Sequence, residues 1–135
     1  MNTKNTCKPN THLIASEKFV GKIISLEEGI SKVTLKITPE MVVDEFGLAH
    51  GSFVFGLADY AAMLAINEPT VVLGKAEVKF IKPVILNEEV TANAKITDNV
   101  GKKIVVNVIV SNQKNELVFE GDFTCFVLDK HILSK

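Results

Sequence analysis

The chain has 135 residues, 47% of them hydrophobic, and its 15 basic and 16 acidic side chains leave a formal net charge of −1. This length fits one globular domain with a real core, and the balanced, interspersed charge argues against a nucleic-acid-binding surface. The two cysteines have no metal or redox spacing, and neither a signal peptide nor an uninterrupted transmembrane run is present. We therefore expect a cytoplasmic protein with no metal and no membrane span.

The N-terminal part of the chain predicts an arm followed by two strands. Residues 1–16 are polar and are expected to form a flexible arm. Residues 19–26 are rich in Val and Ile, and residues 30–37 alternate apolar and polar side chains, the pattern of a half-buried strand. The Thr38-Pro39-Glu40 sequence ends the second strand, and residues 41–50 lead into the next element.

The most apolar stretch, residues 51–67, predicts a central helix buried on every face, because its only charged side chain is Asp59. Its length also suits a membrane-spanning helix, but a carboxylate at mid-span disfavours that alternative. A buried carboxylate is costly unless it is hydrogen-bonded or neutralised. Asp59 is therefore either a satisfied structural residue or a chemically active one.

Four further strands are predicted after the helix from short alternating or apolar segments, at residues 75–80, 90–97, 104–110 and 117–128. The short turns between them predict a meander of consecutive antiparallel strands, and a curved sheet of this kind needs an apolar filler on its concave face. The central helix is the only candidate for that filler. We expect an α+β fold in which a curved antiparallel sheet is wrapped around one long helix, over residues 17–130, with a tail at residues 131–135.

A motif precedes and opens the helix, where Asp44-Glu45-Phe46-Gly47-Leu48-Ala49-His50-Gly51-Ser52 continues to Leu57-Ala58-Asp59. It resembles the motif of the phenylacetate-pathway type of acyl-CoA thioesterases, which runs Asn, Gly, His-Gly-Gly and then an acidic residue nine positions after the His. The strand at residues 75–80, followed by Lys82-Pro83, also resembles that family. In this chain Asp44 replaces the Asn and Ser52 replaces the second Gly.

This resemblance implies a hotdog fold and a hydrolase of fatty acid metabolism that cleaves an acyl-CoA thioester. Coenzyme A is then part of the substrate, and no separate cofactor is expected. The resemblance also implies a homodimer or higher homo-oligomer whose acyl-CoA sites lie at the subunit seam, so that groups from both chains share one site.

Residues 76–123 also resemble the acyl-CoA-binding domain of the fatty-acid-synthesis repressor of Gram-positive bacteria, a hotdog that binds an acyl-CoA without hydrolysing it. In that repressor the positions matching His50 and Asp59 do not hold a His and an Asp, and here both are present, which favours hydrolysis. The alternative is a non-catalytic acyl-CoA-binding sensor that acts through a protein partner. A dehydratase on the same fold is a weaker reading.

Four residues are candidates for the chemistry: Gly51, Asp59, His50 and Asp44. Gly51 stands at the helix start, where unpaired N–H groups and the dipole favour negative charge, so its N–H is the candidate oxyanion donor. The alternative is a glycine needed only for packing. Asp59 is the candidate general base on water, or the nucleophile, with a pKa raised by an apolar setting; the alternative is a structural carboxylate. His50 either orients the substrate or caps the helix.

Asp44 is the main departure from the family motif. An Asn amide can donate a hydrogen bond to water or substrate, and an ionised Asp cannot. Asp44 is therefore protonated, or acts as a base itself, or weakens the activity. The other candidate residues are for substrate binding. An apolar slot beside the helix is expected from Phe46, Phe53 and Leu57, and Gly47 and Ser52 are small positions of the motif. Lys79 and Lys82 are candidates to bind the coenzyme A phosphates.

Overall fold

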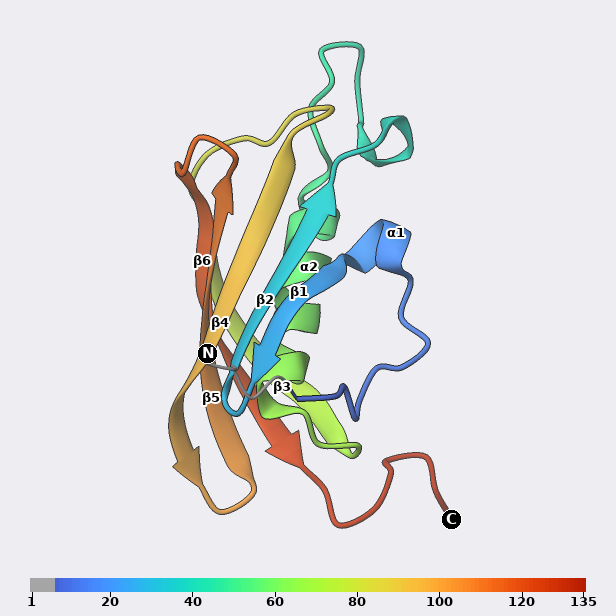
Figure 1. The fold of residues 1–135 in the computed structure, drawn as a ribbon, viewed down its shortest axis with the longest axis vertical. Helices are drawn as coiled ribbons and strands as arrows, with labels where there is room; N and C mark the ends of the chain where they lie inside the picture. Colours follow the sequence, from blue (N-terminus) through green and yellow to red (C-terminus); the bar gives the residue numbers. More distant parts are fainter. Residues whose placement is uncertain (1–6) are drawn as a thin grey trace, which may run out of the picture.

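The computed structural model describes residues 7–135, which form one antiparallel sheet of six strands curved around one long helix, α2 (Gly51–Ile66) (Figure 1). Two short helical segments, α1 (Glu17–Val20) and η1 (Pro39–Met41), lie in the N-terminal half. The strands are β1 (Lys22–Glu27), β2 (Ile30–Lys36), β3 (Val71–Phe80), β4 (Glu89–Val100), β5 (Lys103–Asn112) and β6 (Leu117–Val127). This architecture confirms the predicted α+β fold.

The strand order is β1-β2-β4-β5-β6-β3, and this differs from the predicted meander. Of the four strands after the helix, only β4, β5 and β6 pair in chain order. β3 pairs with β6, from Val71 opposite Val127 to Phe80 opposite Phe119, and forms one edge of the sheet. Residues 81–88 carry the chain from that edge to β4, which pairs with β2. Side-chain alternation assigns the faces of a strand but not its neighbour, so the pattern could not place β3.

The first predicted strand, residues 19–26, is also corrected. Residues Glu17–Val20 form α1, because the Ser16 Oγ accepts a hydrogen bond from the Phe19 N–H at 3.3 Å and caps the turn. Gly21, with a φ of 121°, ends that turn, and the strand begins at Lys22. A side chain on Gly21 would lie 2.6 Å from a Val33 methyl group, so β2 also requires the glycine.

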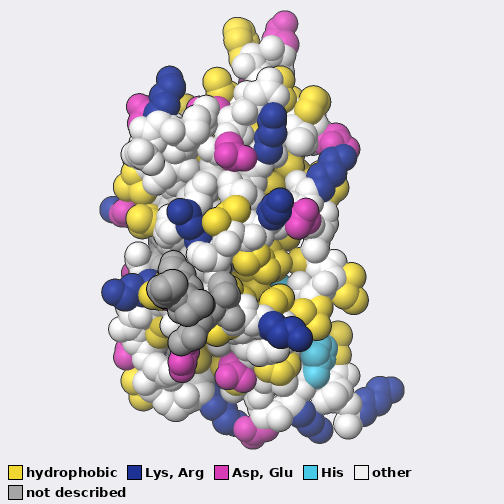
Figure 2. All heavy atoms as spheres, viewed as in Figure 1, with side chains coloured by type: hydrophobic (Ala, Val, Ile, Leu, Met, Phe, Trp, Pro, Cys, Tyr) yellow, Lys and Arg dark blue, Asp and Glu magenta, His cyan; other side chains and the backbone are white. Residues whose placement is uncertain are grey.

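Helix α2 packs mainly on β2, β4 and β5 and supplies nine buried side chains to the core, which are Val54, Leu57, Ala58, Ala61, Ala62, Met63, Leu64, Ala65 and Ile66. The helix was predicted to be buried on every face, but in the single chain one side of it is partly exposed. Ser52 is exposed, and Gly56 and Asp59 are partly exposed on the same side; these three residues define what we call the open face of α2. Figure 2, which has the same view as Figure 1, shows hydrophobic side chains at the surface near the middle of the molecule.

Within residues 7–16, Cys7 packs against the core and Thr11 is buried, most other side chains are exposed, and the segment is held at two points. The Cys7 N–H donates to the Leu26 carbonyl at 2.8 Å, and the Asn67 side chain donates to the Lys8 carbonyl at 2.9 Å and accepts from the Asn10 N–H. Residues 1–6 of the predicted arm lie outside the described residues, and the domain limits stay a prediction. Within residues 7–135, no helix is long and apolar enough to cross a membrane.

Candidate functional site

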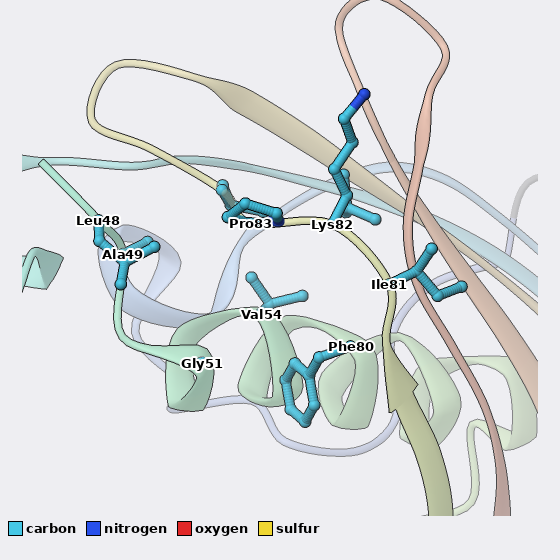
Figure 3. Close-up of a pocket in the computed structure, with 10 residues that line it drawn as sticks. Leu48, Ala49, Gly51, Val54, Phe80, Ile81, Lys82 and Pro83 are labelled. Carbon is cyan, nitrogen blue, oxygen red and sulfur yellow. The ribbon is translucent and has the colours of Figure 1, made fainter.

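A cavity of about 280 Å³ lies between the N-terminus of α2 and the segment that follows β3 (Figure 3). Its lining is apolar apart from Lys82 and the Gly51 backbone, and comprises Leu48, Ala49, Gly51, Val54, Phe80, Ile81, Lys82, Pro83, Val84 and Val118. The Lys82 Nζ extends away from α2 in Figure 3 and pairs with the Glu116 carboxylate at 2.8 Å. The cavity is therefore suited to an uncharged, apolar group.

Gly51 contributes its backbone to this cavity at the first position of α2. Its N–H forms no hydrogen bond within the described part of the chain. The Phe80 ring covers the same spot, because a Cβ on Gly51 would lie 3.2 Å from the Phe80 Cε1. A free N–H at the positive end of a helix dipole is suited to stabilise an oxyanion.

His50 is the N-cap of α2. Its Nδ1 accepts a hydrogen bond from the Ser52 N–H at 3.0 Å, and its own N–H donates to the Met41 carbonyl at 2.8 Å. The exposed ring meets Phe53 edge-on, with the ring centroids 6.4 Å apart. Of the two predicted roles for His50, these contacts support capping, since they satisfy a backbone donor that the helix leaves unpaired.

Asp44 organises the loop before the helix. Its Oδ1 accepts hydrogen bonds from the Phe46 N–H at 3.0 Å and the Leu48 N–H at 3.1 Å, and Gly47 follows with a φ of 82°. An ionised carboxylate makes both bonds, and an Asn oxygen would make the same two. The loop geometry therefore requires neither a protonated Asp44 nor a base role for it. Phe46 is 85% exposed and does not line the cavity.

Asp59 lies on the open face of α2, eight residues after Gly51, a separation of roughly 12 Å along a regular helix. Its Oδ1 is buried and has no hydrogen-bond partner within residues 7–135. Desolvation by burial raises the pKa of this carboxyl to about 6. Burial, followed by the charge of Asp59, raises the pKa of the Cys125 thiol to about 12, so the carboxyl faces β6. Next to it, Phe55 contacts Phe123 of β6, with the ring centroids 5.5 Å apart.

The remaining candidates are dispersed. Leu57 is fully buried in the core, and Phe53 packs against Phe19 with the ring centroids 6.1 Å apart. Ser52 is exposed on α2. Lys79 lies in a polar groove on the other face of β3, beside Glu77. One chain thus brings Gly51 and Lys82 to one cavity and leaves Asp59 apart from them.

Sequence reasoning missed the residues that shape this cavity, in particular Phe80, Val54 and Val118. Phe80 belongs to the alternating pattern that predicted a strand, and Val54 and Val118 belong to apolar runs typical of a core. The only available signal was the proline after the strand, because Pro83 also lines the cavity.

A family model described as fluoroacetyl-CoA-specific thioesterase matches residues 60–131, which is more than half of the chain. Among curated proteins, a methylthioribose-1-phosphate isomerase of Aquifex aeolicus is 45% identical over 88% of this chain, which spans 26% of that relative. The transcription factor FapR of Staphylococcus aureus is 32% identical over 84% of this chain, which spans 61% of FapR. The chain therefore covers less than two thirds of the length of either relative.

Solved structures share the fold. The uncharacterized protein PH1136 from Pyrococcus horikoshii has a TM-score of 0.94 and 53% identity, over 97% of this chain and 100% of that one. The smu.793 protein of Streptococcus mutans, solved bound to acetyl CoA, has a TM-score of 0.78 and 25% identity, over 90% of this chain and 99% of that one. With the matched family model, these likenesses show that the chain has the hotdog fold and belongs to the fluoroacetyl-CoA-specific thioesterase family.

Proposed function

We propose that this protein hydrolyses an acyl-CoA thioester, with Asp59 as the general base and the Gly51 N–H as the oxyanion donor. The observation that carries the proposal is the carboxyl of Asp59, which is buried without a partner for Oδ1 among residues 7–135. A structural carboxylate in such a place is expected to be hydrogen-bonded. With a pKa raised to about 6, the group is still ionised at neutral pH and is a stronger base than an exposed Asp.

In the proposed reaction, the Asp59 carboxylate takes a proton from a water molecule, whose oxygen attacks the carbonyl carbon of the thioester. The carbonyl oxygen becomes an oxyanion, and the Gly51 N–H at the helix N-terminus stabilises it; one such donor contributes roughly 3 kcal/mol to transition-state stabilisation. The carbon–sulfur bond then breaks. The coenzyme A sulfur leaves with the proton held by Asp59, and the other product is a carboxylic acid.

The site requires two copies of the chain. The water on Asp59 and the Gly51 N–H must both lie about 3 Å from the reacting carbonyl group. Within one helix these two residues are roughly 12 Å apart along the axis, so a single chain cannot supply both. We propose a homodimer in which Asp59 of one copy works with the Gly51 of the other. The free edge of β3, ten residues long, supports this assembly, because an unpaired edge of that length is normally covered or paired.

The proposed substrate carries a small, uncharged acyl group. The cavity at Gly51 is lined by aliphatic side chains and Phe80, and its one charged residue, Lys82, is already paired with Glu116. The acetyl CoA bound to smu.793 and the fluoroacetyl-CoA in the family description are both short acyl thioesters. Lys82 remains available to a coenzyme A phosphate only if its pair with Glu116 opens.

The test is the release of free coenzyme A from a panel of acyl-CoAs by wild type and Asp59→Asn. Asn keeps the shape of Asp and removes the proton acceptor, so turnover is expected to fall by roughly two to four orders of magnitude. Acyl-CoA affinity, measured by the rise in Tm with ligand, is expected to change little. A wild-type rate no higher than that of Asp59→Asn rejects hydrolysis.

The relationship to FapR favours one second candidate, a non-catalytic acyl-CoA sensor. The same two measurements separate it from the enzyme. Tight acyl-CoA binding by both proteins without turnover by either supports the sensor. The absence of any Tm shift, from acetyl-CoA to palmitoyl-CoA, rejects both candidates.

A further inference from the structure

Gly56 stands in the middle of α2, where no contact within the described chain requires a glycine. A Cβ built on Gly56 meets no atom within 4 Å, whereas Gly21, Gly51, Gly74 and Gly121 are each crowded by a neighbouring side chain. Its φ is not in the positive region that favours glycine. Glycine in a helix interior is less stable than alanine. The residue thus weakens its own helix, and no packing within residues 7–135 calls for a glycine at this position.

The space above Gly56 adjoins the proposed base. Gly56 and Asp59 are three residues apart and lie on the open face of α2. Helical side chains lean toward the helix N-terminus, so the Asp59 side chain leans toward the turn that contains Gly56, while its buried Oδ1 faces β6. Aromatic contacts flank this face. Phe55 packs on Phe123 of β6 on one side, and Tyr60 packs near His12, with ring centroids 6.4 Å apart, on the other.

The neighbouring Asp59 carboxyl determines which kind of group can bind in the space above Gly56. If an apolar side chain of a second copy filled this space, it would cover the part of the Asp59 carboxyl that is still open as well as the already buried Oδ1, and a carboxylate fully buried without a hydrogen bond is costly. A thioester group and its attacking water bring polar atoms to the carboxyl. We infer that Gly56 is a clearance residue for the substrate, across which the thioester end of an acyl-CoA reaches Asp59. This inference rests on the proposed function.

The test compares wild type with Gly56→Ala. The methyl group meets no neighbouring element within residues 7–135, so the variant is expected to melt roughly 2–4 °C higher, with an unchanged oligomeric state. It enters the space proposed for the thioester, so kcat/KM is expected to fall by about tenfold or more, because small misplacements at a reacting centre are costly. The loss is expected to be equal for acetyl-CoA and longer acyl-CoAs, since the thioester is common to all. A bulkier Gly56→Val variant is expected to lose more turnover than Gly56→Ala.

Two results of this comparison overturn the inference. A higher Tm with unchanged kcat/KM means that no substrate atom passes over Gly56. A lower Tm, or dissociation into monomers, means that a second copy packs there. If wild type releases no coenzyme A, hydrolysis has failed by itself, and acyl-CoA binding then becomes the readout. In that case an affinity reduced about tenfold by Gly56→Ala keeps the clearance role, and an unchanged affinity removes it.

Discussion

Asp59 shows how the environment of one residue separates a structural role from a chemical one. The sequence left two possibilities for a carboxylate in an apolar helix, and a structural role called for a hydrogen bond. The buried Oδ1 has none from residues 7–135, and desolvation alone accounts for the raised pKa. Removing the charge therefore breaks no hydrogen bond or ion pair within residues 7–135, and Asp59→Asn is not expected to lose stability at neutral pH.

The raised pKa of Asp59 predicts how stability depends on pH. The folded-state pKa of about 6 lies above the ordinary value of 3.8, so the folded protein binds more protons than the unfolded chain between these values. The stability that the protonated Asp59 carboxyl contributes is fully present below about pH 4 and is lost as the pH rises through about 6. A pKa difference of this size corresponds to at most roughly 3 kcal/mol.

We therefore expect Asp59→Asn to gain free energy of unfolding relative to wild type between about pH 4 and pH 7. Denaturant titrations of both proteins at the two pH values measure the difference. A difference between the proteins that is the same at both pH values would show that Asp59 titrates alike in the folded and unfolded states.

At the scale of the element, α2 illustrates what the pattern of apolar residues can and cannot establish. The apolar run predicted the helix to within a residue of its observed end, because a continuous apolar stretch of that length is too long for an ordinary strand. It did not predict the open face, since Gly56 is apolar whether or not another element covers it. The motif pointed to Gly51 and Asp59 from a resemblance, but only the helix geometry shows that they cannot act together in one chain.

The N-terminus of α2 gives a prediction that separates the two roles of His50. His50→Ala removes the acceptor for the Ser52 N–H and is expected to destabilise the protein by about 1 kcal/mol. His50→Asn is the matched control, because Asn is a preferred N-cap with its own acceptor. Chemical denaturation and coenzyme A release are measured on both variants.

Capping alone predicts that His50→Asn retains both wild-type stability and turnover. A stable His50→Asn protein with the same loss of turnover as His50→Ala would instead assign the imidazole a contact with the substrate.

At the scale of the whole molecule, the shared site is tested by mixing two inactive variants. Gly51→Pro removes the candidate oxyanion N–H and adds a ring beside Phe80. The helix is expected to accept it, because Pro is tolerated at the first helical position and the preceding His50 already has extended dihedrals, φ −66° and ψ 132°. Gly51→Ala, which adds a Cβ beside Phe80 and keeps the N–H, is the control for crowding. We expect Gly51→Pro to lose about 10²- to 10³-fold in kcat and Gly51→Ala far less.

Gly51→Pro and Asp59→Asn are then unfolded and refolded together. Random pairing makes about half of the dimers mixed, and each mixed dimer holds one fully intact site, so about a quarter of wild-type activity is expected to return. Sites made within one chain cannot be restored by mixing, so an inactive mixture of folded dimers contradicts the shared site. A monomer in light scattering at micromolar concentration contradicts the assembly itself.

The place of β3 has a consequence for the order in which the chain acquires its structure. β3 follows α2 directly in the sequence, yet its partner β6 is made of Leu117–Val127, at the far end of the fold. During synthesis from the N-terminus, β1, β2 and α2 emerge first, while β3 does not meet its partner strand until Leu117–Val127 have left the ribosome. Closing so long a loop is an intrinsically slow step. The edge that we assign to dimer formation is therefore the last part of the sheet to exist, so that subunits meet only after each has finished folding.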